Sequence, residues 1–208
     1  MAIPAEDLLA RVAAALRRPV PSPDDSYLRS YPYLVAHVAA LGRLDEGAFT
    51  AVAHLAYGWM PTVLHLHADA LAAALPCVER ARQGEVLSAA EVQQVAAAVN
   101  RSVVGALKVL HFVNPARYPI WDRRVYRFYH GTPDGRPAAG HFYQVNDAAA
   151  YWAYADICRQ VVRLPGFATV HAAVSVQFQP LPGYAGFQVT PLRALEYVMF
   201  SAAGAVAE

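Results

Sequence analysis

The chain contains little charge, few cysteines and almost no lysine. Of its 208 residues, 16% are charged and 56% are hydrophobic, whereas a typical globular protein has about 25% charged residues. This composition excludes intrinsic disorder, a collagen-like fibre and a coiled coil. The length suits one domain and is too short for two ordinary domains and a linker. We therefore expect a single domain over residues 1–208.

Long hydrophobic runs are also missing, although the mean hydropathy is +0.23. The two charge-free stretches, 47–68 and 164–192, are interrupted by proline, glycine and polar residues. Neither provides the roughly 20 continuous apolar residues of a membrane-spanning helix, and the N-terminus lacks the pattern of a secretory signal. The two cysteines, Cys77 and Cys158, are too few for a disulfide framework. We expect a cytoplasmic protein with no membrane association and no cofactor.

The basic residues are unevenly distributed by type and by position. There are 16 arginines but one lysine, Lys108. Coding bias explains the arginines. The single retained amine is either a chance survivor or a pointer to lysine chemistry, because arginine does not readily lose its proton. Residues 101–136 include seven basic and two acidic residues, so this segment carries +5 and the rest of the chain −4. Such a segment is a candidate phosphate-binding surface, and the alternative is an ordinary solvated surface.

Hydrophobic residues recur at helical spacing along most of the chain, which predicts an all-α fold. The predicted helices cover residues 5–18, 32–41, 46–57, 61–84, 89–100, 102–113, 123–130, 148–163 and 191–204. Their expected N-terminal signals include the capping box Ser88-Ala-Ala-Glu91 and the pair Thr190-Pro191. Asp45, Asp122 and Asp147 are expected to cap three other helices.

Three segments are less clear or are not helical. The helix that begins after Ser88 either bends near Asn100 or restarts at Ser102. Residues 168–179 alternate between apolar and polar side chains, which is compatible with a strand, and so with one short hairpin near 168–189, or with a short helix. Prolines end the first helix at 19–23, and Gly131-Thr-Pro-Asp-Gly135 predicts a turn.

The most informative motif lies between Ser102 and Val125. The sequence SVVGALKVLHFVNPARYPIWDRRV puts Lys108 on a helix and, after a proline-containing loop, puts Asp122 at the start of the next helix. This layout resembles the core of the helix–hairpin–helix DNA glycosylase superfamily through Lys108 and Pro119-Ile-Trp-Asp122. It is also similar to bacterial proteins of unassigned activity with a Lys-x-Leu-His-Phe…Pro-Ile-Trp-Asp motif. Here Gly105 is the only glycine just before the lysine, and Lys108 and Asp122 are 14 residues apart, which is shorter than the family spacing.

The resemblance implies an all-α helical bundle that binds DNA or another nucleic acid, with a glycosylase or lyase activity. Asp122 would stabilise the positive charge that develops on the sugar, and Lys108 would be the attacking amine. His111 lies one turn after Lys108 on the same helix face and is a candidate for proton relay. The candidate nucleic-acid-binding residues are Tyr118 and Trp121, by stacking on an extruded base, and Arg117, Arg123, Arg124 and Arg127, through phosphates.

Each of these residues also has a plainer interpretation. Asp122 is equally suited to a simple N-cap, Lys108 to a helix surface and Trp121 to the core, while His111 suits a hydrogen-bonded loop junction. Under this interpretation the protein is a non-catalytic helical interaction protein. The sequence does not indicate a substrate lesion or an oligomeric state.

No metal site is expected. On the helix predicted for residues 61–84, His65 and His67 point in different directions and cannot share an ion. The remaining candidate set of metal ligands is His54 with either His65 or His67, with Asp69 nearby.

Overall fold

The computed structural model describes residues 3–16, 24–131 and 142–204. The expected proline stop at 19–23, the turn at 132–135 and Arg136 lie outside these ranges. Ten α-helices and one 3₁₀ helix form within them, so the fold is all-α, as predicted. In chain order they are α1 (Ala5–Ala15), α2 (Ser26–Ala40), α3 (Glu46–Trp59), α4 (Ala68–Arg82), α5 (Ala89–Ala98), α6 (Val103–Val113), α7 (Arg123–Tyr129), η1 (Phe142–Asn146), α8 (Ala148–Val161), α9 (Phe167–Phe178) and α10 (Pro191–Gly204).

The local capping signals are confirmed at the predicted positions. Asp45, Asp122 and Asp147 each accept a hydrogen bond from a backbone N–H in the first turn of the following helix. Ser88 and Glu91 form the reciprocal capping box. Thr190 Oγ1 accepts from the backbone N–H of Arg193 at the start of α10. These contacts satisfy N–H groups that have no partner within the helix.

The predicted break between the fifth and sixth helices is a restart. α5 ends at Ala98, and Ser102 caps α6 by accepting from Gly105 N–H. The turn between them contains two residues with positive φ, Asn100 at 54° and Arg101 at 51°. The Asn100 side chain stabilises this unfavourable conformation by accepting from His65 N–H and donating to the Val63 carbonyl.

Two helices begin at a different place from the prediction. α2 begins at Ser26, where Asp25 accepts from the N–H groups of Tyr27 and Leu28, and Pro32 lies inside the helix rather than at its start. α4 begins at Ala68 rather than at Pro61. Residues 64–67 are not helical because Leu66 pairs with Val99 in an isolated antiparallel bridge.

The hairpin predicted near 168–189 is wrong, because residues 167–178 form α9. The buried residues of α9 are Phe167, Val170, Val174 and Phe178, whose spacing of three or four residues is helical. Val176, which fitted the alternating pattern of a strand, is 66% exposed. Within the described ranges no strand forms beyond the isolated bridge.

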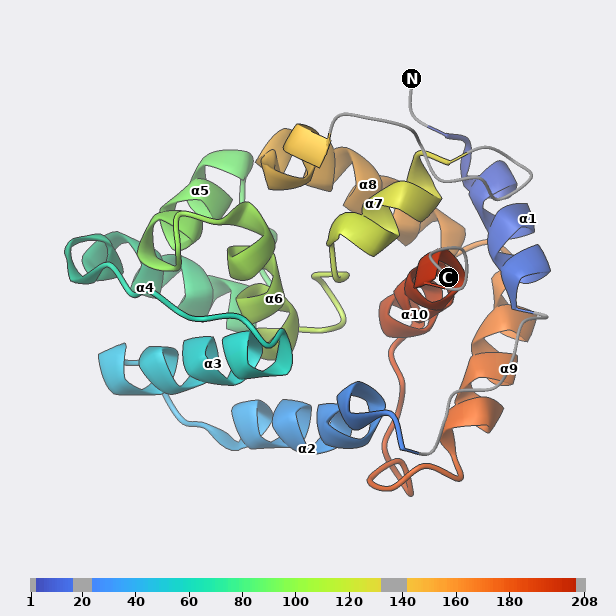
Figure 1. Cartoon of the computed structure of the whole chain (residues 1–208), viewed down its shortest axis with the longest axis horizontal. Helices are drawn as coiled ribbons and strands as arrows, with labels where there is room; N and C mark the ends of the chain where they lie inside the picture. The colour runs from blue at the N-terminus through green and yellow to red at the C-terminus, as the bar shows by residue number, and fades with distance from the viewer. Residues whose placement is uncertain (1–2, 17–23, 132–141, 205–208) are drawn as a thin grey trace.

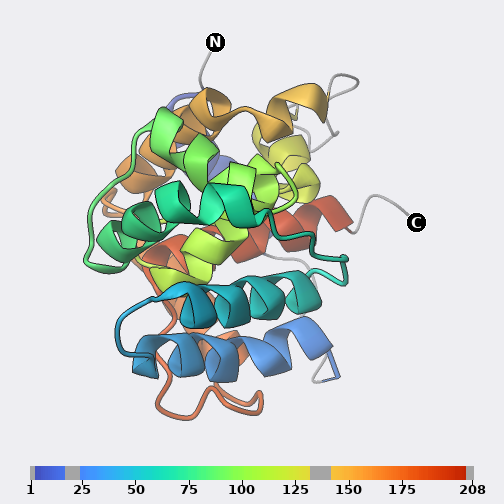
Figure 2. The same ribbon diagram turned by 90° about the vertical axis from the view of Figure 1, so that its left-hand side faces the viewer.

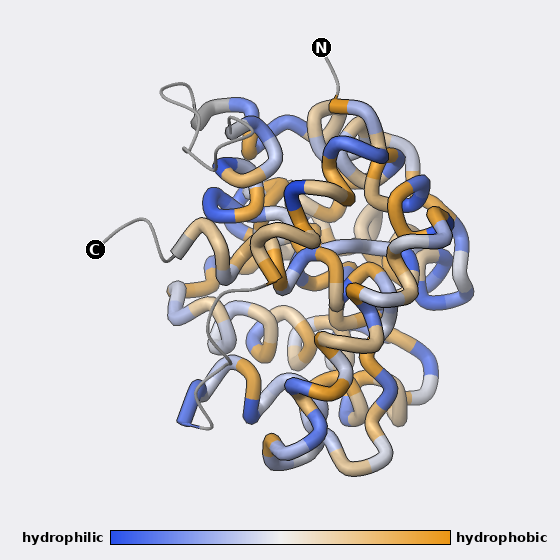
Figure 3. The backbone as a smooth tube through the Cα atoms, turned by 90° about the vertical axis from the view of Figure 1, so that its right-hand side faces the viewer, coloured by the Kyte–Doolittle hydropathy of each residue, from blue (hydrophilic) through white to orange (hydrophobic). Residues whose placement is uncertain are grey.

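The helices surround one connected hydrophobic core to which all ten α-helices contribute. α6 contacts α2, α3, α4 and α5, and α7 contacts α10; Figure 1 shows α6 between these two groups. α2 and α3 lie side by side (Figure 2). Hydrophobic and hydrophilic residues alternate along the helices (Figure 3), as expected of helices with one buried face. None of the helices in the described ranges combines the length and apolar character needed to span a membrane.

Candidate functional site

Lys108 and Asp122 face each other between α6 and α7. Lys108 Nζ lies 3.8 Å from Asp122 Oδ2, and the two side chains are 12% and 16% exposed. The other carboxylate oxygen of Asp122, Oδ1, accepts from Val125 N–H at 2.9 Å and caps α7. One carboxylate therefore performs two separate tasks, since one oxygen holds the helix and the other faces the amine.

Opposing effects act on the pKa of Lys108, and burial is the largest of them. Burial lowers the pKa of the ammonium below its ordinary value, Asp122 opposes this by raising it, and the positive charge of Arg193 lowers it further. Lys108 Nζ also lies 5.8 Å from the centre of the Trp59 ring. The net lowering of the pKa increases the fraction of free amine, which is the nucleophilic form.

The pair lines a pocket of about 320 Å³ at the junction of α2, α3, α6, α7 and α10. This volume lies at the lower end of the range of about 300–1,000 Å³ for small-molecule sites. Two exposed arginines, Arg123 and Arg124, also line it, and the Arg124 guanidinium lies 4.7 Å from the centre of the Phe200 ring. The other lining residues are Asp25, Tyr27, Leu28, Trp59, Met60, Ile120, Arg193, Glu196, Tyr197, Phe200 and Ser201.

Arg193 and Glu196 are pocket residues that the sequence prediction missed. They form a buried ion pair one turn apart on α10, with side chains 5% and 1% exposed. The Arg193 guanidinium lies 4.3 Å from the centre of the Tyr31 ring and 5.9 Å from that of Trp59. The only sequence signal was an Arg-x-x-Glu spacing, which is common on helix surfaces and does not indicate burial.

His111 is placed in the core and does not line the pocket. Its Nδ1 donates to the Tyr118 carbonyl at 2.7 Å, which leaves Nε2 of the neutral ring to accept from the Tyr31 hydroxyl at 2.8 Å. Burial lowers the pKa of His111 to about 3. A ring that is fully buried, has both nitrogens occupied and stays neutral is poorly suited to the expected proton relay.

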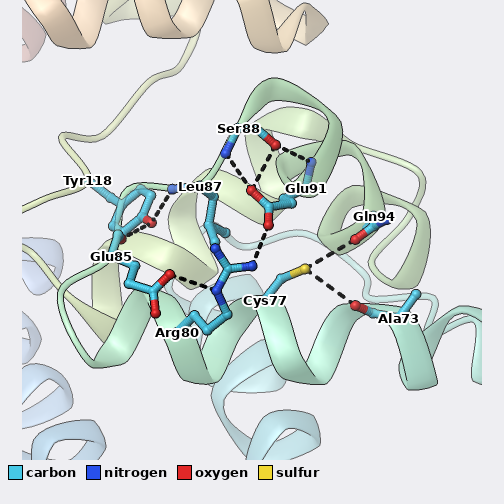
Figure 4. A network of polar contacts seen from close by, with 9 residues as sticks. All are labelled: Ala73, Cys77, Arg80, Glu85, Leu87, Ser88, Glu91, Gln94 and Tyr118. Atoms are coloured by element: carbon cyan, nitrogen blue, oxygen red, sulfur yellow. Dashed lines mark hydrogen bonds and ion pairs between the residues drawn. The ribbon is translucent and has the colours of Figure 1, made fainter.

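Tyr118 and Trp121 are also in the core, with 0% exposure. The Trp121 indole N–H donates to the Val145 carbonyl at 3.0 Å. The Tyr118 hydroxyl donates to the Glu85 carbonyl and accepts from Leu87 N–H (Figure 4). Neither ring presents a face on which an extruded base can stack, and the aromatic residues that line the pocket are Trp59, Tyr27, Tyr197 and Phe200 instead.

The four arginines predicted to bind phosphates are not all brought together. Arg123 and Arg124 line the pocket next to Asp122. Arg117 is exposed and Arg127 is half-buried, and neither lines the pocket. Of the predicted site residues, the structure therefore gathers Lys108, Asp122, Arg123 and Arg124 around one pocket.

The histidines do not form a metal site with other residues of the described ranges, in which no three His, Cys, Asp or Glu side chains are close enough to share an ion. His65 and His67 flank the bridge residue Leu66 in a non-helical segment, so the prediction that they lie on a helix is wrong. Cys77 and Cys158 are both buried and free.

The chain was also compared with known proteins. No protein-family model matches it, and no match to a curated protein or to a solved structure was found. The assignment of a function therefore depends on the geometry and chemistry of the pocket.

Proposed function

We propose that the protein binds nucleic acid and cleaves a glycosidic bond in the pocket that contains Lys108 and Asp122. The observation that carries this proposal is the 3.8 Å approach of the amine to the carboxylate inside a pocket that Arg123 and Arg124 also line. A partly desolvated amine, an adjacent carboxylate and nearby cations are the groups that such a reaction on a phosphate-linked sugar requires.

In this proposal, Arg123 and Arg124 bind the phosphates, and the aromatic side chains that line the pocket bind the base. Both arginines are exposed and line the pocket, which places two positive charges where a phosphate backbone would approach. Trp59 and Tyr197 line the pocket and provide planar surfaces of the kind on which bases stack. The pocket volume suits one nucleotide unit rather than a stretch of duplex.

In the reaction we propose, the free amine of Lys108 attacks C1′ of the sugar while the C1′–N bond to the base breaks. The base leaves with the electron pair of that bond. The nitrogen of Lys108, now bonded to C1′, releases a proton to Asp122, and this proton is passed to the departing base. The ionised carboxylate of Asp122 also stabilises the positive charge on the sugar before the new bond is complete.

The alternative function, a non-catalytic helical interaction protein, is favoured by one set of contacts. Asp122 caps α7, and the buried Tyr118 and Trp121 are hydrogen-bonded within the fold. These contacts suit a motif whose role is structural. The alternative does not account for a solitary lysine that is nearly buried beside the same aspartate.

Binding is tested with fluorescent duplex, abasic-site duplex and single-stranded oligonucleotides over a series of salt concentrations. The affinity should fall steeply as salt rises, because phosphate contacts release counterions. The double variant Arg123→Glu, Arg124→Glu should abolish binding at moderate salt. The double variant Arg43→Glu, Arg163→Glu has the same change in charge at exposed positions outside the pocket and should retain most of the affinity. Equal loss in both double variants, or no binding of any oligonucleotide at low salt, would contradict the proposal.

A further inference from the structure

The segment that leads to Asp122 is extended, buried and held by side chains. Residues 118–121 lie between α6 and α7, outside both helices, and all four are buried. The carbonyls of Tyr118, Pro119 and Ile120 are therefore shielded from water and need partners elsewhere in the protein. Three consecutive carbonyls find three different side-chain donors.

The first donor comes from the helix that contains Lys108. His111 Nδ1 donates to the Tyr118 carbonyl at 2.7 Å, and the ring is held in turn by the hydroxyl of Tyr31. His111 follows Lys108 by one turn of α6. This bond therefore ties the start of the segment to the lysine helix itself.

The other two donors come from α8. The Tyr151 hydroxyl donates to the Pro119 carbonyl at 3.4 Å, and the Tyr154 hydroxyl donates to the Ile120 carbonyl at 3.1 Å. Both tyrosines are fully buried, and burial raises the pKa of each hydroxyl well above its ordinary value, which keeps it protonated as a donor. Ile120 lies only two residues before Asp122, so the Tyr154 bond acts closest to the carboxylate.

The side chain of Tyr118 fixes the other side of the segment. Its hydroxyl bridges the Glu85 carbonyl and the Leu87 N–H in the loop between α4 and α5 (Figure 4). That loop is itself braced by Arg80, which pairs with both Glu85 and Glu91. The segment is thus attached to α6, to α8 and to the loop between α4 and α5, and through the Trp121 indole also to η1.

We propose that His111, Tyr151 and Tyr154 are positioning residues that hold the 118–121 segment so that Asp122 faces Lys108. The inference rests on the Lys108–Asp122 pair of the proposed function, but it requires no particular substrate. The N-cap bond of Asp122 Oδ1 alone does not fix the direction of the preceding chain. The approach of Asp122 Oδ2 to Lys108, in contrast, depends on where residues 118–121 are held.

The test is an NMR titration of Lys108 in protein labelled with ¹³C-lysine, in which the single lysine gives one side-chain resonance. Asp122→Asn should lower the pKa of Lys108 by about 1, the scale of one nearby opposite charge. Tyr154→Phe should lower the pKa of Lys108 by a smaller but measurable amount, because the Ile120 carbonyl loses its donor and Asp122 is held less firmly beside Lys108. The phenylalanine ring still fills the same space in the core. Tyr151→Phe, whose bond is longer, should have a smaller effect. The charged groups that line the pocket around Lys108 are Asp25, Asp122, Arg123, Arg124, Arg193 and Glu196, and the tyrosine variants change none of them.

A matched control is Tyr57→Phe. Tyr57 is also buried, and its hydroxyl donates to the Val99 carbonyl at 3.3 Å, away from the 118–121 segment. This variant should titrate as wild type even if its thermal stability falls as much as that of Tyr154→Phe. His111→Leu should lower the pKa of Lys108, and His111→Gln, which retains a donor for Tyr118, should restore most of it.

Distinct outcomes separate this inference from the proposed function. If Asp122→Asn shifts the titration but Tyr154→Phe and His111→Leu leave it at the wild-type value, the positioning inference is wrong. If Tyr57→Phe shifts it as much as Tyr154→Phe, the effect is a general loss of packing and the inference is again wrong. Failure to bind or cleave any oligonucleotide would reject the proposed function while leaving this titration unchanged.

Discussion

Acidification should destabilise the protein through His111. Burial lowers the pKa of this residue to about 3 in the folded state, whereas the unfolded value is about 6.5. Between these values the unfolded chain binds one more proton than the folded chain, so the free energy of unfolding falls as the pH falls. The slope is about 1.4 kcal/mol per pH unit, which gives a loss of about 2 kcal/mol between pH 6.5 and pH 5.

The assay is urea unfolding of wild type and His111→Gln at pH 6.5 and pH 5, followed by circular dichroism. The glutamine variant should be less stable at pH 6.5, because the geometry of its two hydrogen bonds is poorer. It should, however, lose about 2 kcal/mol less than wild type on acidification, since it does not titrate. Burial also lowers the pKa of His130, but that contribution is common to both proteins and cancels in the difference. An equal loss in both proteins would show that His111 is not held neutral, and the hydrogen-bond assignment would be wrong.

Two further substitutions separate the roles of particular residues. Asp122→Asn keeps an acceptor for the N–H groups of α7 and should lower the free energy of unfolding by only a few tenths of a kcal/mol. Asp122→Ala should lower it by about 1 kcal/mol more. Any base release should fall by orders of magnitude in both variants. Full activity in Asp122→Asn would reject the electrostatic role of the carboxylate. Gly105→Ala should destabilise the protein by about 1–3 kcal/mol in chemical unfolding, although alanine is the better helix former, because a Cβ at this position would lie 2.0 Å from the hydroxyl of the buried Tyr57. A more stable Gly105→Ala variant would mean that Tyr57 moves freely.

The helices could be predicted largely because their start signals are local. Asp45, Ser88, Asp122 and Asp147 each contact an N–H two or three residues away, so the sequence alone contains both partners. α2 was misplaced because a proline was interpreted as its start, whereas the stronger signal was the cap at Asp25. The segment of α9 was left open between strand and helix because alternation and helical spacing coincide over a short apolar stretch, and the choice between them depends on which face the rest of the fold buries.

The candidate site was predictable only in part, for the same physical reason. Lys108 and Asp122 lie close in sequence, on either side of one loop, so the sequence could pair them, although contacts from α8 also hold that loop. Arg193 and Glu196 come from the last helix and Trp59 from the third, and only tertiary packing brings them to the lysine. The motif pointed to His111, Tyr118 and Trp121 as relay and stacking residues, but all three are buried and none lines the pocket. The sequence pattern does not distinguish side chains that face a pocket from side chains that hold the chain beside it.

The measurement that most directly tests the central claim is borohydride trapping on an abasic-site duplex. The amine of Lys108 would condense with the C1′ aldehyde of the open sugar to give an imine, and hydride addition would convert this to a stable amine cross-link. We expect one cross-link that maps to Lys108 by peptide mass analysis, with a lysine-free tag and a blocked α-amino group. Lys108→Arg should lose the cross-link but retain DNA affinity, because arginine keeps the charge and cannot form the imine. Clear duplex binding with no adduct, or an adduct that survives in Lys108→Arg, would contradict the assignment of Lys108 as the nucleophile.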